Sequence, residues 1–178
     1  VVIPSRSLRE FTAVFSDEIE TVEVFFANNQ ILFRSEHISF YTRLLEGNYP
    51  DTDRLIPTEF NTEATFNVAN LRFAMERARL LSNATQNGTV KLEFKNGVVS
   101  SHVHSPEVGR VNEEIDTSAV SGEDLSISFN PTYLIEALKA IDSEQVVIRF
   151  ISSVRPFTLV PEGNEQGFIQ LITPVRTN

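Results

Sequence analysis

The side chains best suited to metal chemistry are two histidines, His102 and His104, which lie two positions apart. Side chains with this spacing on a β-strand point to the same face, so the pair could offer two ligands to zinc, with Glu107 nearby. The spacing places no third ligand, and the hairpin signal Asn96-Gly97 just before the pair favours a strand face in water. We therefore predict no metal site, and a metal hydrolase is the least favoured of three functional hypotheses.

No other arrangement of residues predicts catalysis. His37 is isolated, no motif brings a serine, a histidine and an aspartate together, and the seven glycines are scattered in turns and form no phosphate-binding loop. The chain has no cysteine, which excludes disulfides and thiolate metal ligands and fits a reducing cytoplasm. No apolar run approaches the roughly 18 residues of a membrane span. We predict a cytoplasmic protein that is not an enzyme, has no cofactor and does not enter a membrane.

The distribution of charge is more informative than its total. The chain carries 15 Lys and Arg against 24 Asp and Glu, a net charge of -9, which by itself argues against binding to nucleic acid. However, the three predicted helices (5–14, 67–83 and 130–141) contain six basic and three acidic residues, whereas the remainder contains nine basic and 21 acidic residues. Helices that share one side of an assembly would make that side positive. The alternative interpretation is that Arg and Lys occupy solvated helix faces.

The helices that carry these charges belong to a pattern of strands and helices that recurs along the chain. One stretch reads "LSISFNPTYLIEALKAI", in which apolar residues first alternate as in a half-buried strand and then recur at helical spacing. Between the two patterns, Asn130 is a predicted helix N-cap and Pro131 the first helical residue. The chain therefore passes directly from a strand into a helix.

The same passage from strand to helix occurs twice more. It is found in "EATFNVANLRFAMERARLLSN", with Asn67 or Asn70 as the cap, and in "VVIPSRSLREFTAVF", with Ser5 or Ser7 as the cap. The three copies begin near residues 1, 63 and 124, and each helix is followed by short apolar runs that are separated by turn signals. Each copy is predicted to form strand, helix, strand, strand, strand, and such a period indicates duplicated units.

One such unit has an uncovered apolar face, so two units are expected to pair into one domain of an α+β fold. The odd unit should be the first. Residues 1–58 are then predicted to be the second half of a domain whose first half is missing, and residues 59–178 a complete domain. The segment "DRLIPTEFNTE" is the predicted linker.

The chain resembles a known family along its whole length, as the C-terminal half of the bacterial DNA polymerase III beta subunit, or sliding clamp. The resemblance is carried, in the right order, by "VIPSRSLREF", "EGNYPDTDRLIP", "RARLLSN", "SGEDLSISFNPTYLIEAL", "SVRPF" and "ITPVR". It implies a DNA clamp fold with helices on one face and sheets on the other. In that family, two head-to-tail subunits of three domains close a ring around duplex DNA, with helices lining the hole.

The resemblance implies a processivity factor that tethers replication enzymes to DNA without reading its sequence. The candidate DNA-facing residues are Arg6, Arg9, Arg72, Arg77 and Lys139. Contacts from these side chains to phosphate would be independent of sequence and sensitive to salt. The runner-up hypothesis is a peptide-binding adaptor that is built from the same repeats and does not encircle DNA.

The resemblance also implies a cleft for short apolar motifs of the polymerase, the clamp loader and repair proteins. The residues it assigns to this cleft are Pro50, Arg54, Leu55, Asn130, Tyr133, Val154, Pro156, Leu171, Ile172, Thr173, Pro174, Val175 and Arg176. Family members often have Met where this chain has Thr173 and Val175. The alternative for the C-terminal run is an edge strand packed into a sheet.

Assembly is the last expectation from the resemblance. Leu80 and Leu81 match apolar residues at the contact between the last domain of one subunit and the first domain of the other, so the full-length protein is expected to be a homodimer. The alternative is that both leucines pack in the core.

Overall fold

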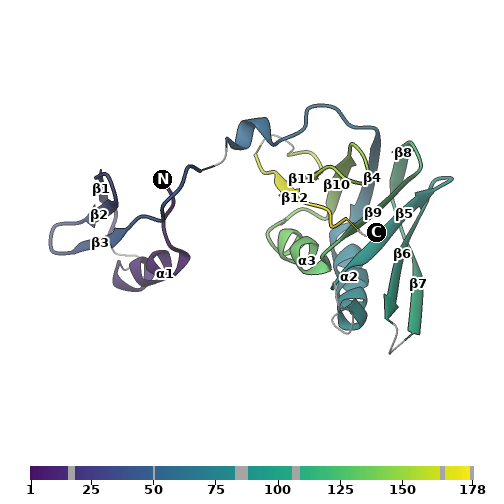
Figure 1. The fold of residues 1–178 in the computed structure, drawn as a ribbon, viewed down its shortest axis with the longest axis horizontal. Helices are drawn as coiled ribbons and strands as arrows, with labels where there is room; N and C mark the ends of the chain where they lie inside the picture. The colour runs from purple at the N-terminus through teal and green to yellow at the C-terminus, as the bar shows by residue number, and fades with distance from the viewer. Residues whose placement is uncertain (16–18, 50, 83–87, 106–108, 165–166, 177–178) are drawn as a thin grey trace. The chain divides into compact units, whose positions relative to one another are not determined.

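The computed structural model describes residues 1–15, 19–49, 51–82, 88–105, 109–164 and 167–176 (Figure 1). The chain forms two compact units, Val1–Asp53 (unit 1) and Arg54–Asn178 (unit 2). The division falls between Asp53 and Arg54, whereas the sequence analysis placed it between residues 58 and 59. Each unit is described by itself.

Unit 1 consists of one helix and one antiparallel sheet. Helix α1 (Ser5–Val14) precedes β1 (Glu23–Phe26), β2 (Gln30–Arg34) and β3 (Ser39–Arg43), and the strand order is β1-β2-β3. The core of the unit is small: Phe15, Ile31 and Phe33 are buried, and the ring of Phe11 lies 4.6 Å from that of Phe33. No residue of α1 itself is buried, so this helix covers the sheet only partly.

The start of unit 1 differs from the prediction in two ways. Residues 1–4 form no strand among the described elements, although the Leu45 amide donates to the Val2 carbonyl at 2.8 Å. The predicted cap, Ser5 or Ser7, is wrong, because the N-cap is Pro4 and no side chain caps the helix. Ser7 lies inside the first turn of α1, and its hydroxyl is 2.8 Å from the Thr42 hydroxyl on β3.

Unit 2 contains two helices and two sheets. After the short 3₁₀ helix η1 (Thr52–Arg54), its elements are β4 (Thr62–Asn67), α2 (Val68–Ser82), β5 (Val90–Lys95), β6 (Val98–Ser105), β7 (Gly109–Ile115), β8 (Ala119–Gly122), β9 (Leu125–Phe129), α3 (Pro131–Lys139), β10 (Gln145–Phe150), β11 (Phe157–Pro161) and β12 (Gln170–Ile172). One sheet has the order β12-β11-β10-β4-β8 and the other β7-β6-β5-β9.

The two repeats of unit 2 exchange their first strands. Strand β4 opens the first repeat but pairs with β10 of the second, and β9 opens the second repeat but pairs with β5 of the first. Strand β8 is a fourth strand after α2, where three were predicted, and it crosses over to pair with β4. The expected pairing of two repeats into one domain thus occurs within unit 2, through shared sheets as well as side-chain packing.

A single core lies between the sheets and the helices of unit 2. Four phenylalanine rings pack together within it: the ring centres of Phe94 and Phe150 are 4.9 Å apart, and that of Phe157 is 5.1 Å from those of both Phe129 and Phe150. Helices α2 and α3 lie side by side against this core (Figure 1). The α+β clamp fold predicted from the sequence is confirmed by this arrangement and by the structural neighbours given below.

Local signals for helix starts and turns are confirmed in unit 2. The Asn70 amide donates to the Asn67 side chain at 3.0 Å, and the Thr132 amide donates to the Asn130 side chain at 2.9 Å, so both helices begin at capping asparagines. The Asn96-Gly97 hairpin joins β5 to β6, with φ of 51° and 78° at the two positions. No helix in the described part of the chain is long and apolar enough to cross a membrane.

Candidate functional site

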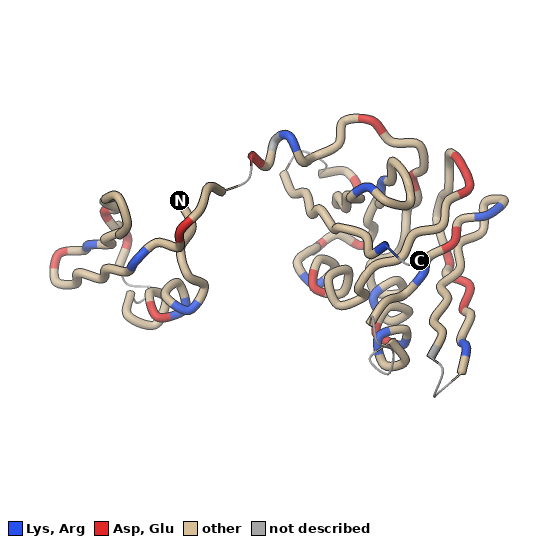
Figure 2. The backbone as a smooth tube through the Cα atoms, in the orientation of Figure 1, with Lys and Arg blue, Asp and Glu red and all other residues tan. Residues whose placement is uncertain are grey.

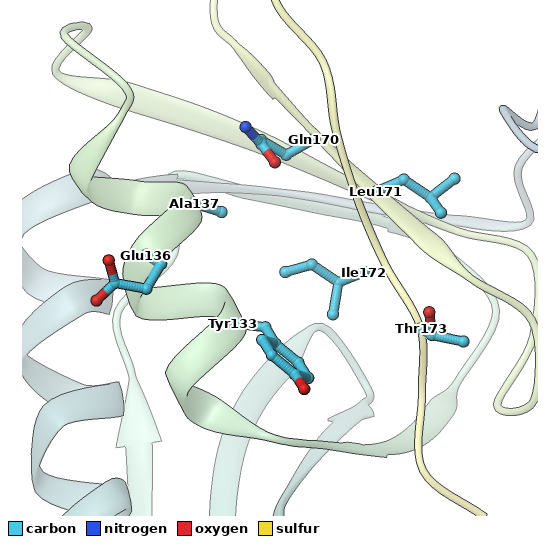
Figure 3. A pocket seen from close by; sticks show the side chains of 7 residues that line it. All are labelled: Tyr133, Glu136, Ala137, Gln170, Leu171, Ile172 and Thr173. Atoms are coloured by element: carbon cyan, nitrogen blue, oxygen red, sulfur yellow. The ribbon is translucent and has the colours of Figure 1, made fainter. Parts of the chain in front are cut away.

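An open hollow of about 350 Å³ lies between α3 and β12 in unit 2 (Figure 3). Tyr133 and Ala137 are four positions apart, which puts both on one face of α3, and the cap at Asn130 fixes where that face begins. The hollow is lined by Tyr133, Glu136, Ala137, Gln170, Leu171, Ile172 and Thr173.

Strand β12 forms the opposite wall of the hollow. It pairs with β11 and is the edge of its sheet among the described strands, so the hollow lies beside a row of unpaired backbone groups. Ile172 is buried and points from the strand toward α3, whereas Leu171 points to the other side (Figure 3). Beyond β12, the Val175 amide donates to the Ser128 carbonyl at 2.7 Å and holds the C-terminal run against β9.

The predicted cleft residues fall into two groups. Tyr133, Leu171, Ile172 and Thr173 line the hollow, and Asn130 caps the helix that forms it. The remaining described residues of the prediction lie outside it: Arg54, Leu55, Val154, Pro156, Pro174, Val175 and Arg176. Pro50 is outside the described residues.

Two of the predicted cleft residues that lie outside the hollow have exposed apolar side chains. Leu55 is 50% exposed and Val154 is 54% exposed. The hollow also contains three residues that the sequence analysis missed, Glu136, Ala137 and Gln170. Position on α3 could have identified the first two, because each lies within about one turn of Tyr133.

Glu136 is the charged group at the helix side of the hollow. The Lys139 ammonium donates to its carboxylate at 2.8 Å. This bond, the charge of Lys139 and the charge of Arg79 lower the pKa of Glu136 below its ordinary value. The hollow is therefore bordered by a carboxylate that stays ionised to lower pH than an isolated glutamate.

Most of the candidate DNA-facing side chains are paired with carboxylates. Lys and Arg positions recur along α1 and α2 (Figure 2). Arg6 bonds Glu10 at 3.0 Å, the Arg72 Nε lies 3.8 Å from Glu76, and Lys139 bonds Glu136. Arg9 makes no ion pair with any described residue and is exposed. The Arg6–Glu10 and Lys139–Glu136 pairs are exposed and therefore weak, so these two bases remain able to turn toward a stronger anion. Arg72 differs, because it is partly buried and its Nε is enclosed.

Arg77 has a stronger partner than the other basic residues. Its Nε donates to a Glu113 oxygen on β7 at 3.2 Å, and its Nη2 contacts the second oxygen. The hydrogen bond to Glu113 raises the pKa of Arg77 further above its already high value. A bidentate pair of this kind fixes the guanidinium plane, so Arg77 joins α2 to the edge strand of the second sheet.

The two candidate interface leucines have different environments. Leu80 is 73% exposed on α2, and Leu81 packs against the core of unit 2. Leu81 therefore follows the alternative of core packing, whereas Leu80 presents an apolar side chain to solvent.

The histidine pair forms part of a polar strand face, as the preferred interpretation expected. His102 lies between Asn112, whose side-chain oxygen is 2.8 Å from Nδ1, and Ser100, whose hydroxyl is 2.9 Å from Nε2. Glu93 lies 3.4 Å from the same Nε2. No group of three potential metal ligands was found in the part of the chain that the structure describes. Glu107 lies outside those residues.

The architecture and the sequence relatives define the class of protein. A domain built from two repeats, each a strand followed by a helix and further strands, with sheets shared between the repeats, is a DNA clamp fold. The sequence-family model of the DNA polymerase III beta subunit central domain matches residues 1–51, and the family model of the C-terminal domain matches residues 53–176. The chain belongs to the DNA polymerase III beta subunit family.

Curated relatives agree along the whole chain. It is 80% identical over 178 residues to the Beta sliding clamp of Streptococcus pneumoniae serotype 4 and 54% identical to that of Lactococcus lactis, covering 100% of this chain and 47% of each relative. The chain thus spans about half the length of the curated relatives it matches.

Solved structures of DNA polymerase III beta subunits have the same fold as this chain. The DNA polymerase III beta chain of S. pneumoniae TIGR4 superposes with a TM-score of 0.90 at 80% identity, covering 99% of this chain and 47% of that one. The DNA polymerase sliding clamp of Bacillus subtilis has a TM-score of 0.84 at 38% identity, covering 100% and 47%.

Proposed function

We propose that the full-length protein is a DNA sliding clamp, a non-catalytic processivity factor of the DNA polymerase III holoenzyme that acts in the cytoplasm. The observation that carries this proposal is the 80% identity, along the whole chain, to the Beta sliding clamp of S. pneumoniae. In this proposal residues 1–58 are the second half of the middle domain, residues 59–178 are the last domain, and the missing half of the protein completes a subunit of the ring.

The DNA-facing residues in this proposal are Arg6, Arg9, Arg72, Arg77 and Lys139. Their helices carry the positive side chains, and a mostly acidic remainder disfavours phosphate elsewhere. Arg6 and Arg9 lie on an exposed helix and are the strongest candidates. Because phosphate contacts are sequence-independent, the clamp slides on any duplex.

The test is a full-length clamp that carries Arg6→Ala and Arg9→Ala. We expect weaker retention on primed circular DNA, and a salt dependence lower by about one unit of slope for each phosphate-binding side chain that the substitutions remove. The matched control is Arg34→Ala, which removes a base that pairs with Glu23 on the sheet. Unchanged retention and an unchanged salt response in the double variant would exclude these arginines from the hole.

The hollow between α3 and β12, together with the exposed Leu55 and Val154, is the proposed cleft for partner peptides. Its occupants are short apolar motifs of the polymerase, the clamp loader and repair proteins, typically a glutamine followed by leucines and an aromatic residue. Ligand clefts form where a few apolar side chains and unpaired polar groups converge, as they do beside β12.

Deletion of residues 173–178 from the full-length protein tests the cleft. We expect binding of polymerase and loader peptides to be abolished together, because a few buried anchors carry roughly 2 kcal/mol or more each. Fluorescence anisotropy gives the affinity and circular dichroism controls for folding. Tyr133→Ala is the matching point variant, and Val98→Ala, exposed on the hairpin at the start of β6, is its control. Equal affinities in a folded truncation would place the partner site elsewhere.

The homodimer is proposed to use Leu80 as its apolar anchor in unit 2. Full-length Leu80→Ala is expected to dissociate at concentrations where the parent protein is dimeric, since exposed apolar anchors dominate such interfaces. Leu81→Ala is expected mainly to lower stability. Sedimentation velocity at micromolar concentration measures both, and an intact Leu80→Ala dimer would contradict the assignment.

A further inference from the structure

A row of three apolar side chains crosses the sheet of unit 1 from edge to edge. Phe25 is paired in register with Leu32, and Leu32 with Tyr41, so the three side chains lie on one face. Phe25 is 43% exposed and Tyr41 is 73% exposed. We call Phe25, Leu32 and Tyr41 the unit 1 row.

Unit 2 contains the counterpart of this row. Its second repeat has the same three strands after the helix, and there Arg149 is paired with Thr158 and Thr158 with Leu171. We call these residues the unit 2 row. The neighbouring positions support the correspondence, since Ile31 beside the first row and Phe157 beside the second both face the core and are buried.

In unit 2 the row is covered by the segment that leads into β4. The ring of Phe60 lies 5.7 Å from the Arg149 guanidinium, and Glu63 bonds the same guanidinium at 2.6 Å. The Asn61 amide donates to the Phe150 carbonyl at 2.8 Å, and the Asn61 side chain donates to the Ile151 carbonyl at 3.1 Å. Thr158, in the centre of the row, is only 1% exposed.

Unit 1 has no such cover among its described residues. The Arg34 guanidinium lies 4.7 Å from the centre of the Phe25 ring and is held by Glu23, but Tyr41 has no comparable neighbour. The model of the central domain matches residues 1–51 with a single repeat, whereas the model of the C-terminal domain matches residues 53–176 with two. The first repeat of the central domain, and the segment that enters it, therefore belong to the part of the relatives that this chain does not span.

We infer that in the full-length protein the unit 1 row is the docking surface for the segment that leads into the missing first repeat of the middle domain. That segment places an aromatic or aliphatic side chain, the counterpart of Phe60, over Phe25 and Leu32. The chemistry of the row supports this occupant: unit 2 offers a guanidinium, which is met by a ring and a carboxylate, whereas unit 1 offers two aromatic rings and a leucine, with Arg34 over Phe25 at one end. The inference depends on the repeat and is independent of DNA binding.

The experiment measures side-chain access in the full-length protein in a background without cysteine. Tyr41→Cys reports on the row, and His37→Cys, whose parent side chain is 91% exposed in the loop between β2 and β3, is the control in the same unit. We expect a maleimide reagent to label Tyr41→Cys at least about tenfold more slowly than His37→Cys, because labelling would then require local opening. Phe25→Cys, at the other end of the row, is a second reporter, and circular dichroism verifies that each variant is folded.

Two results would overturn the inference. Equal labelling of Tyr41→Cys and His37→Cys in a folded full-length protein would show that the row is open to solvent. Protection that disappears on dilution to nanomolar concentration would show that a second copy covers the row. Protection that persists on dilution in both reporters supports the connecting segment.

Discussion

Unit 1 and the second repeat of unit 2 share one order of elements and differ in burial. Leu8 on α1 is 41% exposed, whereas Leu134 on α3 is fully buried. Val24 on β1 is 44% exposed, whereas Ile148 on β10 is fully buried. The difference shows that one repeat encodes only half of a core, and that the second half is supplied by a partner repeat through shared sheets and packed helices.

The largest expected difference concerns an aromatic pair at matching positions. Phe150 contacts the rings of Phe94 and Phe157 and is fully buried, whereas its counterpart Phe26 is 64% exposed. In the 178-residue chain, Phe150→Ala should destabilise unit 2 by about 3–5 kcal/mol, and Phe26→Ala should destabilise unit 1 by less than about 1 kcal/mol.

The same two variants in the full-length protein test why the units differ. If a partner repeat completes unit 1, Phe26→Ala should there become nearly as costly as Phe150→Ala. Hydrogen exchange resolved by peptide measures the stability of each unit separately. A small effect of Phe26→Ala in both proteins would contradict the idea that the core of unit 1 is incomplete.

Local signals explain which parts of the fold were predictable. The Asn130 cap, the Asn96-Gly97 hairpin and the alternation into Phe129 are properties of a few neighbouring residues, and the structure has all of them. The exchange of β4 and β9 between sheets and the crossover of β8 are fixed by long-range pairing, such as the bond from the Ser118 amide to the Thr65 carbonyl. No local pattern encodes such contacts.

The candidate site divides in the same way. The resemblance located Tyr133 and the run from Leu171 to Thr173, but it did not show that Glu136 and Gln170 lie beside them, because α3 and β12 are far apart in sequence. It also did not show that Arg77 is held by Glu113 of the edge strand β7. Charge on a helix can be counted from a sequence, but its partners depend on how the helix packs.

A smaller difference between the units is expected in the stability cost of replacing a glycine that has a positive φ. Gly122 has φ of 99°, and a Cβ there would lie 1.9 Å from the Asn61 carbonyl oxygen, whereas Gly47 has φ of 117° and nothing within 4 Å. Gly47→Ala should therefore cost about 1 kcal/mol from backbone conformation alone, and Gly122→Ala clearly more, because β8 must also move from β4. Urea denaturation of each variant measures the costs, and equal values would mean that β8 yields easily.

Basic residues on α1 and α3 are expected to contribute differently to DNA binding. Glu10 on α1 and Glu136 on α3 occupy matching helix positions, and each neutralises one base, Arg6 and Lys139 respectively. Arg9 has no such partner among the described residues. In the full-length clamp we expect Arg9→Ala to lower the salt dependence of DNA retention by about one unit of slope, and Lys139→Ala to lower it by less. The reverse order would show that α3, and not α1, carries the stronger phosphate contact.

The smallest expected effect is the titration of Glu136. Its pKa is lowered chiefly by the hydrogen bond from Lys139, so the folded protein holds this proton less tightly than the unfolded chain does. The favourable contribution is therefore present at pH values above the ordinary glutamate pKa of about 4.3 and is lost as the pH falls through the lowered value. Because the Glu136 side chain is exposed, the effect on stability should be small and confined to acid pH.

Carbon-detected NMR of the Glu136 carboxyl measures this shift directly. Lys139→Ala should raise the titration midpoint toward the ordinary value, and Lys139→Arg should leave it low, because a guanidinium also donates to the carboxylate. Lys91→Ala, which removes a base near Glu93 on the sheet, is the control and should leave Glu136 unchanged. A midpoint that does not respond to Lys139→Ala would mean that the pair is open in solution, and Lys139 would then be as available to phosphate as Arg9.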